Sequence, residues 1–552
     1  MIYPVYRYTR TDRILAAVLA AVILLLCLGS LNYSCIWGDD SAAYISEGIA
    51  IANGTFREHV RLTPMMHPSN LGDNAQDELV YVWGYPLLLS VVYLIDGFDT
   101  DNYSNIIAYK LPSAFFLAVM TFCFFLLLRR RFSLGASAFV TCFFCSAALF
   151  TDTVNSLYSD MVYTGMCMLT LLVIELYLEE DERGRLIVKG VFVGALIWYS
   201  MEVRTNGAVF IAVLLTAQIT LLIKAKHFSK EKLVPALIPY AVFLALKLVT
   251  EYIFLLPATA NSADVALGTA EFIANNTLYY IINLFDFAFQ LFSNLFGSFL
   301  MWFLSAEKLE KIVPFTAALS KAFAGLSMAM AALGIFTDGI KKNQYLTLYL
   351  LGCTIGTCIL PFNQGLRYLL GVMPVMAIFS VYGYRWVYFR LFRVIPEKRK
   401  KRFFAGKAAV TAAVAILCIA SCTAQYLADS ENIRRIKVNG DDIHAGSEEM
   451  YSPAAIEVYS YIKEKTPSDA VFAFHKPRAL YLNTGRLGFS YLVNGNDAYD
   501  ADYCILPELF YDAYINGEAP EWFSDFEVVL RNSELTVMKN NSELLIDPRD
   551  TL

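Results

Sequence analysis

The stretch "RILAAVLAAVILLLCLGSLNY", Arg13 to Tyr33, decides the class of fold. Its apolar part is long enough to cross a hydrocarbon core about 30 Å thick. Arg7, Arg10 and Arg13 give it the basic flank of a secretory signal. The apolar part is too long for a signal, however, and no small-x-small cleavage site stands out. We therefore interpret the stretch as an uncleaved first membrane span.

The composition of the whole chain agrees with this interpretation. Of 552 residues, 57% are hydrophobic and 17% are charged, and the mean hydropathy is +0.48. Soluble proteins carry about 25% charged residues. The apolar residues also gather in long blocks, so the sequence predicts a polytopic α-helical membrane protein. Most of the cysteines lie inside these blocks. Cys35 and Cys504 lie outside them without metal-ligand neighbours, and we expect no disulfide framework.

Clusters of Lys and Arg in short loops predict the cytoplasmic side. Such clusters occur at Arg129–Arg131, at residues 224–232, at Lys341–Lys342, and at residues 390–407, where eight residues are basic and one is acidic. The segment 34–105 has ten acidic residues and two basic ones, so we expect it outside. The chain would then be a multi-pass plasma-membrane protein with a cytoplasmic N-terminus.

About 11 to 13 transmembrane helices are expected. The count of 11 puts the C-terminal segment outside, opposite the N-terminus. The run 278–304 is apolar but contains Asn283, Asp286, Gln290 and Asn294. If it crossed the membrane alone, the later basic loops would fall on the outer side. It is therefore expected along the outer interface or as a re-entrant hairpin. The expected spans are 14–33, 106–128, 132–150, 161–178, 186–201, 207–223, 233–256, 316–338, 345–361, 368–389 and 408–427.

The composition changes after Leu427, where a tail with 22 acidic and 11 basic residues begins. We divide the chain into a membrane module, residues 1–427, and a soluble extracytoplasmic α/β domain, residues 428–552. About 120 residues suffice for an independent core. The patterns in the tail predict a helix at 454–465, strands at 470–474 and 501–507, and a terminal hairpin that turns at Asn532–Ser533.

Two adjacent carboxylates, Asp39 and Asp40, follow the first span directly, and Tyr44 and Glu47 return towards the same side one to two helical turns later. One interpretation is that the pair caps an outer helix. The other is a functional site, because two carboxylates at a low-dielectric boundary raise each other's proton affinity unless a cation neutralises them.

Further polar features lie at the same expected side. The stretch "VYVWGYPLLLSVVYL", Val80 to Leu94, contains Tyr85 and favours an interfacial helix over a span. Asp160 lies at the outer mouth of the fourth span, where it could also serve as a helix cap.

Three cations, Lys110, Arg204 and Arg367, lie at outer span ends. A charge at membrane depth is costly unless it is paired or hydrated, which makes each a site candidate. Arg204 could instead pair with Glu202 or an Asp, and Arg367 could extend to the surface. Together the three predict a bound anion such as a phosphate, which matches the fork of a guanidinium.

These features resemble the GT-C superfamily of lipid-linked-sugar glycosyltransferases, in the group with protein O-mannosyltransferases and aminoarabinose transferases. The resemblance rests on the order of several short motifs. They are "GDDSAAY", "WGYPLLL", the Ser159–Asp160 pair, the Arg204–Gly207 segment, "GLRYLLGVMP", and the tail motif "FHKPRALYLNTGR" at 474–486.

The resemblance implies a sugar donor carried on a polyprenyl monophosphate. It implies that Asp39 is the general base of a single inverting displacement, while Asp40 stands where the family commonly has Glu. Asp160 joins the catalytic candidates, and Arg204, Arg367 and Lys110 are the candidates for binding the donor phosphate. The candidates for substrate binding are Tyr44, Glu47, Tyr85, Tyr368, Arg478 and Arg486.

Several alternatives stay open in the sequence. A divalent metal is possible, with His67, Glu78 and the acidic pair as conceivable ligands, but their spacing matches no metal motif. The acceptor could be a protein, a glycolipid or a cell-wall polymer, and no nucleic-acid partner is expected. A lipid transporter or flippase, and a scaffold that binds a lipid-linked glycan without reacting, are the competing functions.

Overall fold

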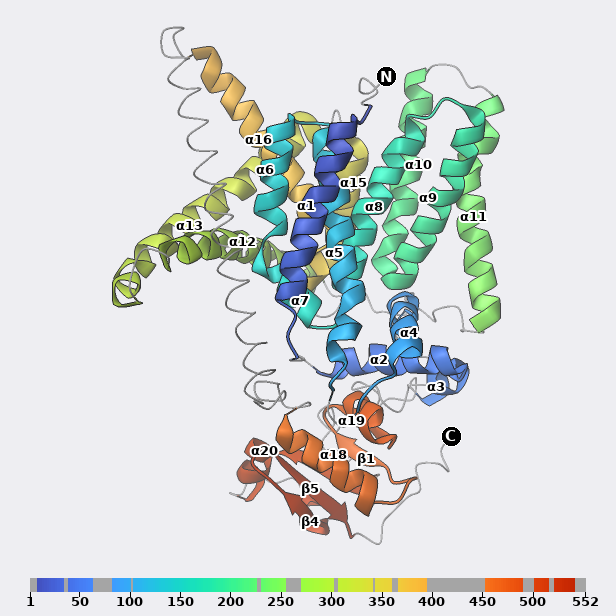
Figure 1. Ribbon diagram of the computed structural model, residues 1–552, viewed down its shortest axis with the longest axis vertical. Coiled ribbons are helices and arrows are strands. Elements are labelled where there is room, and N and C mark those ends of the chain that lie inside the picture. The colour runs from blue at the N-terminus through green and yellow to red at the C-terminus, as the bar shows by residue number, and fades with distance from the viewer. Residues whose placement is uncertain are drawn as a thin grey trace.

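The computed structural model is mainly helical, with a small sheet near the C-terminus (Figure 1). It describes residues 7–33, 38–62, 82–100, 103–225, 230–254, 270–301, 306–340, 343–359, 366–394, 452–489, 501–515 and 521–541. The helices of the membrane module are α1 (Arg10–Gly29), α2 (Gly38–Asn53), α3 (Phe56–Leu62), α4 (Gly84–Asp96), α5 (Ile106–Arg129), α6 (Leu134–Cys145), α7 (Ala148–Asn155), α8 (Asp160–Leu178), α9 (Arg183–Val203), η3 (Thr205–Ala208), α10 (Val209–Ala225), α11 (Lys230–Phe254), α12 (Ala270–Met301), α13 (Ala306–Gly334), η4 (Ile335–Gly339), α15 (Gln344–Ile359), η5 (Leu366–Leu369) and α16 (Met373–Val394).

Seven helical stretches of the described chain are long and apolar enough to cross a membrane. Among them, α5 packs between α1 and α8, and α9 packs between α8 and α11. Many of their large apolar side chains face outward, as expected of helices in contact with lipid. The stretches are Arg10–Gly29, Ile106–Arg129, Asp160–Leu178, Arg183–Val203, Thr205–Ile223, Val234–Ile253 and Pro314–Gly339.

A helix lies at every expected span as far as residue 389. Those expected at 345–361 and 368–389 correspond to α15 and α16. The eleventh expected span, 408–427, and the predicted domain boundary both lie outside the described residues. The prediction of a polytopic helical protein is confirmed.

The third expected span, 132–150, is broken. It consists of α6 and α7, which are bent by 48° at the break. Ala147, between them, has an extended backbone, with φ −65° and ψ 131°. The second piece carries Asp152 and Asn155, which suit the bundle end better than the bilayer interior.

The run 278–304 belongs largely to α12, a continuous helix of 32 residues. The re-entrant hairpin that the sequence allowed is therefore wrong. This helix packs along α13, and the two extend sideways from the bundle in Figure 1. It is not among the described helices that meet the criteria for a span.

The segment between the first two bundle helices lies across one end of the bundle (Figure 1). Here α2 packs against α4, and α4 packs against α9. At the second contact a Cβ on Gly84 would lie 2.4 Å from the carbonyl oxygen of Glu202. The Gly in "WGYP" thus allows the two backbones to touch. The interfacial helix predicted at 80–94 corresponds to α4 (Gly84–Asp96).

The C-terminal part forms a five-stranded sheet in the order β2-β1-β3-β5-β4, with parallel pairs β1–β2 and β1–β3 and antiparallel pairs β3–β5 and β4–β5. The predicted helix, two strands and hairpin are confirmed, whereas α19, β2 and α20 were not foreseen. The elements are α18 (Pro453–Lys465), β1 (Phe472–Phe474), α19 (Pro477–Thr484), β2 (Gly488–Phe489), β3 (Tyr503–Pro507), α20 (Glu508–Ala513), η8 (Glu521–Asp525), β4 (Phe526–Arg531) and β5 (Leu535–Asn540).

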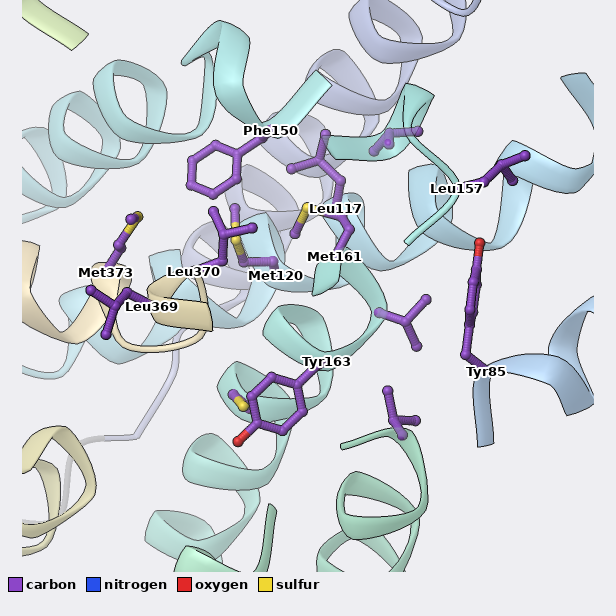
Figure 2. Close-up of a cluster of buried hydrophobic side chains, with 14 of the residues drawn as sticks. Tyr85, Leu117, Met120, Phe150, Leu157, Met161, Tyr163, Leu369, Leu370 and Met373 are labelled. Carbon is purple, nitrogen blue, oxygen red and sulfur yellow. The ribbon is translucent and has the colours of Figure 1, made fainter. Parts of the chain in front are cut away.

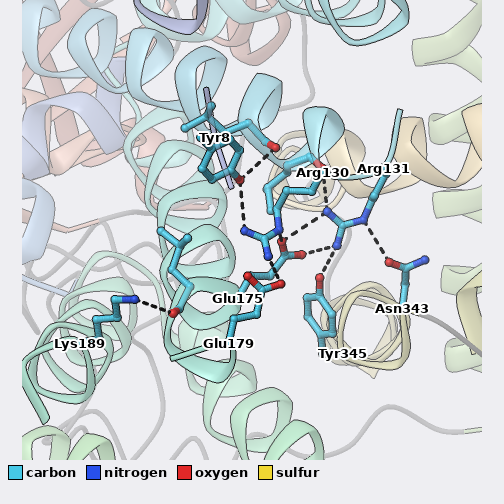
Figure 3. Close-up of polar contacts among 11 residues, drawn as sticks. Tyr8, Arg130, Arg131, Glu175, Glu179, Lys189, Asn343 and Tyr345 are labelled. Carbon is cyan, nitrogen blue, oxygen red and sulfur yellow. Dashed lines mark hydrogen bonds and ion pairs between the residues drawn. The ribbon is translucent and has the colours of Figure 1, made fainter. Parts of the chain in front are cut away.

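A buried ion-pair network stabilises the bundle end opposite α2 (Figure 3). Glu175 of α8 pairs with Arg131 and, at 2.7 Å, with Arg130. The Nε of Arg131 also donates to Asn343 at 3.1 Å, and Arg131 contacts Tyr345 of α15. Arg130 and Arg131 belong to the basic cluster that predicted the cytoplasmic side. Through these contacts they also connect the end of α5 with α8 and with the start of α15.

We predict that Glu175→Gln destabilises the protein. The change leaves two largely buried guanidinium groups without their shared carboxylate, which costs about 3–5 kcal/mol. Thermal unfolding in detergent should show a clearly lower midpoint. The control is Glu182→Gln, which removes the partner of Arg185 in a pair that is 70% and 60% exposed. Exposed pairs contribute about 0–1 kcal/mol, so the two variants should differ strongly. Equal midpoints would contradict a structural role for the network.

Candidate functional site

The first turn of α2 carries the acidic pair at the bundle end that faces the C-terminal domain. Asp39 is 6% exposed and Asp40 is half-buried. Burial is the largest influence on the Asp39 carboxyl, and it raises the pKa of that group above its ordinary value. The pair begins its helix, but its carboxylates contact other segments, so it is more than a helix cap.

Arg367, in the short turn η5, neutralises Asp40. One terminal nitrogen lies 2.9 Å from the Oδ2 of Asp40. The guanidinium carbon also lies 4.8 Å from the ring centre of Tyr158 and 5.6 Å from that of Tyr368. Asp40 and Asp160 raise the pKa of Arg367, although burial opposes them. Arg367 therefore does not extend to the surface, which was the alternative raised from the sequence.

Arg204 forms the second ion pair of the site. Its NH1 lies 2.9 Å from the Oδ1 of Asp160, and its Nε donates to the Oγ of Ser159 at 3.3 Å. The same Ser159 oxygen lies 3.2 Å from the hydroxyl of Tyr44, which connects the pair to α2. The ring centre of Tyr368 lies 4.6 Å from the Arg204 guanidinium carbon. Both arginines thus lie against the ring of Tyr368.

Apolar neighbours hold these polar segments in place. Leu157 and Met161 flank the Tyr158–Asp160 segment, and Leu369 and Leu370 follow Tyr368. All four side chains are at most 1% exposed, and Figure 2 shows them within one buried cluster. The site rests on packed core at two of its contributing segments, which limits how far its charges can move.

The backbone turn after Arg204 depends on a glycine. The N–H of Gly207 donates to the carbonyl of Arg204 at 2.8 Å. A Cβ at this position would lie 2.5 Å from backbone atoms of Ser200 and Met201. Any other residue would displace the turn. The tight turn from Arg204 to Gly207 thus connects α9 to α10 directly after the arginine.

The third cation comes from the C-terminal domain. A terminal nitrogen of Arg478 lies 3.9 Å from the Oδ2 of Asp39 and 3.9 Å from the Oδ1 of Asp40. The backbone N–H groups of Arg478 and Ala479 donate to the Oδ1 of Asp39, at 3.0 and 3.4 Å. These amides belong to the first turn of α19, so a carboxylate of α2 lies at the positive end of another helix.

Most predicted site residues come together here. Glu47 is buried on α2 one turn beyond Tyr44, and the ring of Tyr85 meets that of Tyr44 edge-on, with centres 5.1 Å apart. Eight of the predicted residues are linked by the contacts above. They are Asp39, Asp40, Tyr44, Asp160, Arg204, Arg367, Tyr368 and Arg478.

Two predicted residues have other contacts. The Nζ of Lys110 is fully buried and donates to the backbone oxygen of Asn32 at 2.7 Å and to the Oδ1 of Asn155 at 3.4 Å. Arg486 donates to the carbonyl oxygen of Thr466, at 3.2 Å, inside the C-terminal domain.

The contacts in the structure decide two questions that the sequence left open, namely what neutralises Arg204 and whether Ser159 or Asp160 caps a helix. Glu202 does not neutralise Arg204, because it pairs with Lys247 at 2.9 Å. Ser159 precedes α8 but makes no side-chain capping bond, and the Asp160 carboxylate faces Arg204.

Sequence reasoning missed the helix α19 itself. Its signals were present: Pro477 stands in the first turn, and Gly485 follows the last turn with φ 69°. Proline at a helix start and glycine just past its end are characteristic. Tyr158, which lies against Arg367, was also missed, because an aromatic beside a span has no distinctive local signal.

Metal ligation receives no support within the described ranges. No group of three or more His, Cys, Asp or Glu side chains is close enough to hold an ion there. The acidic pair faces guanidinium and amide donors. The other conceivable ligands, His67 and Glu78, lie outside the described residues.

Comparison of the whole chain with known proteins identifies the architecture. No family model and no curated protein matches the sequence. Among solved structures, ArnT from Cupriavidus metallidurans bound to undecaprenyl phosphate aligns over 96% of this chain and 98% of its own, with 12% identity and a TM-score of 0.53. This chain has a GT-C fold.

A second solved structure supports this result. The oligosaccharyltransferase AglB from Archaeoglobus fulgidus, in complex with an inhibitory peptide and a dolichol-phosphate, aligns over 90% of this chain and 70% of its own. The identity is 12% and the TM-score 0.51. The GT-C fold inferred from short motifs is thereby confirmed.

A pH dependence follows from His59 of α3, which is 6% exposed and lies beside Tyr481 of α19, with ring centres 5.6 Å apart. Burial lowers the pKa of His59 to about 4. The unfolded chain takes up a proton near pH 6.5 and the folded chain does not, so stability falls as the pH drops from about 6.5 to 4.

We expect the midpoint of thermal unfolding to fall over this pH range by less in His59→Gln than in the wild type. Each pH unit in the window corresponds to about 1.4 kcal/mol. The measurement is an unfolding curve in detergent at half-unit pH steps for both proteins. Parallel pH dependences would show that His59 is not buried in its neutral form.

Proposed function

We propose that this protein is a membrane glycosyltransferase that moves a sugar from a polyprenyl-phosphate donor to an acceptor hydroxyl on the outer face of the plasma membrane. The observation that carries the proposal is the convergence of three carboxylates and three guanidiniums at one end of a GT-C bundle. The solved proteins of this fold include one bound to undecaprenyl phosphate and one bound to a dolichol-phosphate.

Asp39 is the proposed general base. An alcohol is a weak nucleophile, and a carboxylate within hydrogen-bond reach can take its proton as the oxygen attacks the anomeric carbon. The raised pKa of the buried Asp39 carboxyl suits this task, because a base works best when its pKa approaches the working pH. Asp40 and Asp160 hold the arginines around it.

Arg204 and Arg367 are proposed to receive the lipid phosphate. In the reaction the acceptor oxygen forms a bond to the anomeric carbon while the bond from that carbon to the phosphate oxygen breaks. The acceptor proton passes to Asp39, and the bonding electrons leave with the phosphate. A guanidinium has five N–H donors, so each arginine can keep its aspartate and still bind a phosphate oxygen. One displacement inverts the anomeric centre.

The position of the site suits both substrates. The bundle end covered by α2 would face outward if the Arg130–Glu175 end is cytoplasmic, as the loop charges predict. A lipid-linked donor can reach such a site from the bilayer and an acceptor from the water. Tyr44, Tyr85 and Tyr368 supply aromatic surface, which suits sugar and lipid groups. No step in this scheme requires a metal.

The test is sugar transfer by the purified protein in detergent. A panel of polyprenyl-phosphate sugars is supplied with a peptide, a glycolipid and a cell-wall fragment, and products are detected by mass spectrometry. Asp39→Asn should lower turnover by about 100-fold or more, because an amide cannot accept the proton. The control is Asp96→Asn, an exposed position at the end of α4, which should match the wild type.

The outcomes separate the competing functions. Full turnover in Asp39→Asn would exclude this residue as the base. Movement of the lipid across vesicles without sugar transfer would favour a transporter. Tight binding of the lipid-linked sugar with neither transfer nor movement would favour a scaffold.

A further inference from the structure

Asp39 is the point at which the C-terminal domain meets the candidate site. Its Oδ1 accepts two backbone N–H groups from the first turn of α19, and Arg478 of the same turn faces both members of the acidic pair. The two chain segments lie 439 positions apart in sequence. Both Asp39 and Arg478 are nearly buried, at 6% exposed each.

We propose that α19 is the positioning element of the general base, with Arg478 as the residue that orients Asp39 and keeps it ionised. This inference rests on the proposed function. It assigns the C-terminal domain a direct part in the reaction, and it assigns Arg478 to the base instead of to a substrate anion.

The two oxygens of Asp39 have different surroundings, which supports this role. Oδ1 is held by two amides from α19, and such charge-assisted bonds fix a carboxylate firmly. Oδ2 lies 3.9 Å from the NH1 of the Arg478 guanidinium, beyond hydrogen-bond distance. The arginine therefore stabilises the negative charge without occupying Oδ2, which is the oxygen placed to receive a proton.

Contacts on both sides of this turn seat α19 on the first outer segment. Tyr103 donates to Asn483, and Asn483 donates to the carbonyl of Ala479 at 2.8 Å. Tyr481 lies against His59 of α3. The helix is thus fixed at its middle and end as well as at its start, and a fixed helix can hold a base in one orientation.

Charged and titratable groups of α2, α18 and α19 lie around Asp39. Burial raises its pKa most, Arg478 and then Lys476 lower it, and Asp40 raises it. Removing Arg478 therefore raises the pKa of Asp39 further. The groups that interact with it electrostatically are Asp40 on α2, Tyr459 on α18, and Lys476 and Arg478 at the start of α19.

The experiment is the pH profile of kcat/KM for transfer, measured for the wild type, Arg478→Gln and Arg478→Lys. We expect the acid limb of Arg478→Gln to move to higher pH by about one unit or more, since an opposite charge this close shifts a carboxyl by about 1–3 units. Transfer at a pH below the limb should fall about tenfold or more and recover in alkaline buffer. Arg478→Lys should restore most of the profile.

Arg531→Gln is the matched control, because it removes an exposed guanidinium that pairs with Glu508 and Asp512 at the edge of the same domain. Its profile should match the wild type. If Arg478→Gln fails to fold, Lys476→Gln gives a smaller shift in the same direction.

Three results would overturn the inference. They are an unmoved acid limb in Arg478→Gln, a loss of equal size at every pH, and turnover above the wild type, which would make α19 an inhibitory cover. Absence of transfer by the wild type with every donor and acceptor would instead contradict the proposed function.

A second measurement needs no turnover. Carbodiimide labels protonated Asp39, and mass spectrometry of the labelled protein should show the same upward shift of the pH midpoint of labelling in Arg478→Gln.

Discussion

The organisation of this protein depends on one constraint, that a charge taken out of water must meet an opposite charge. Asp160 is 1% exposed, and its charge is compensated by Arg204, 2.9 Å away. Asp40 has the same relation to Arg367. Breaking one such pair leaves an isolated buried charge, which costs several kcal/mol. The four chain segments that supply these groups therefore have to meet at one end of the bundle.

The same constraint operates at the opposite end of the bundle with a different result. There Glu175 joins Arg130 and Arg131, and the Asn343 amide, just before α15, and the Tyr345 hydroxyl of α15 complete the network. The Glu175 carboxylate is shared between two cations, and the pairs hold the neighbouring helices together. At the α2 end each of two carboxylates, Asp40 and Asp160, has its own arginine, and two amides of α19 bind one oxygen of Asp39.

The sequence predicted which residues would lie at the site, but it did not predict which partner each residue would contact. Asp39, Asp160 and Arg204 could be foreseen because each is a charge at the end of an apolar run, where it needs a partner. Their pairings could not, since Glu202 lies two positions from Arg204 and yet contacts Lys247. Lys110 followed the same rule but meets neutral oxygens of Asn32 and Asn155.

The contact between α19 and Asp39 could not be predicted from the sequence. Its donors are backbone N–H groups, which nearly every residue has, and the two partners lie 439 positions apart. That separation also fixes when the site can exist during biosynthesis. A ribosome has already produced the acidic pair when the first span is made, yet Asp39 has no neighbour from α19 until nearly the whole chain has been synthesised. The membrane module is therefore synthesised before Asp39 has these contacts, and the candidate site is complete only once α19 has been made.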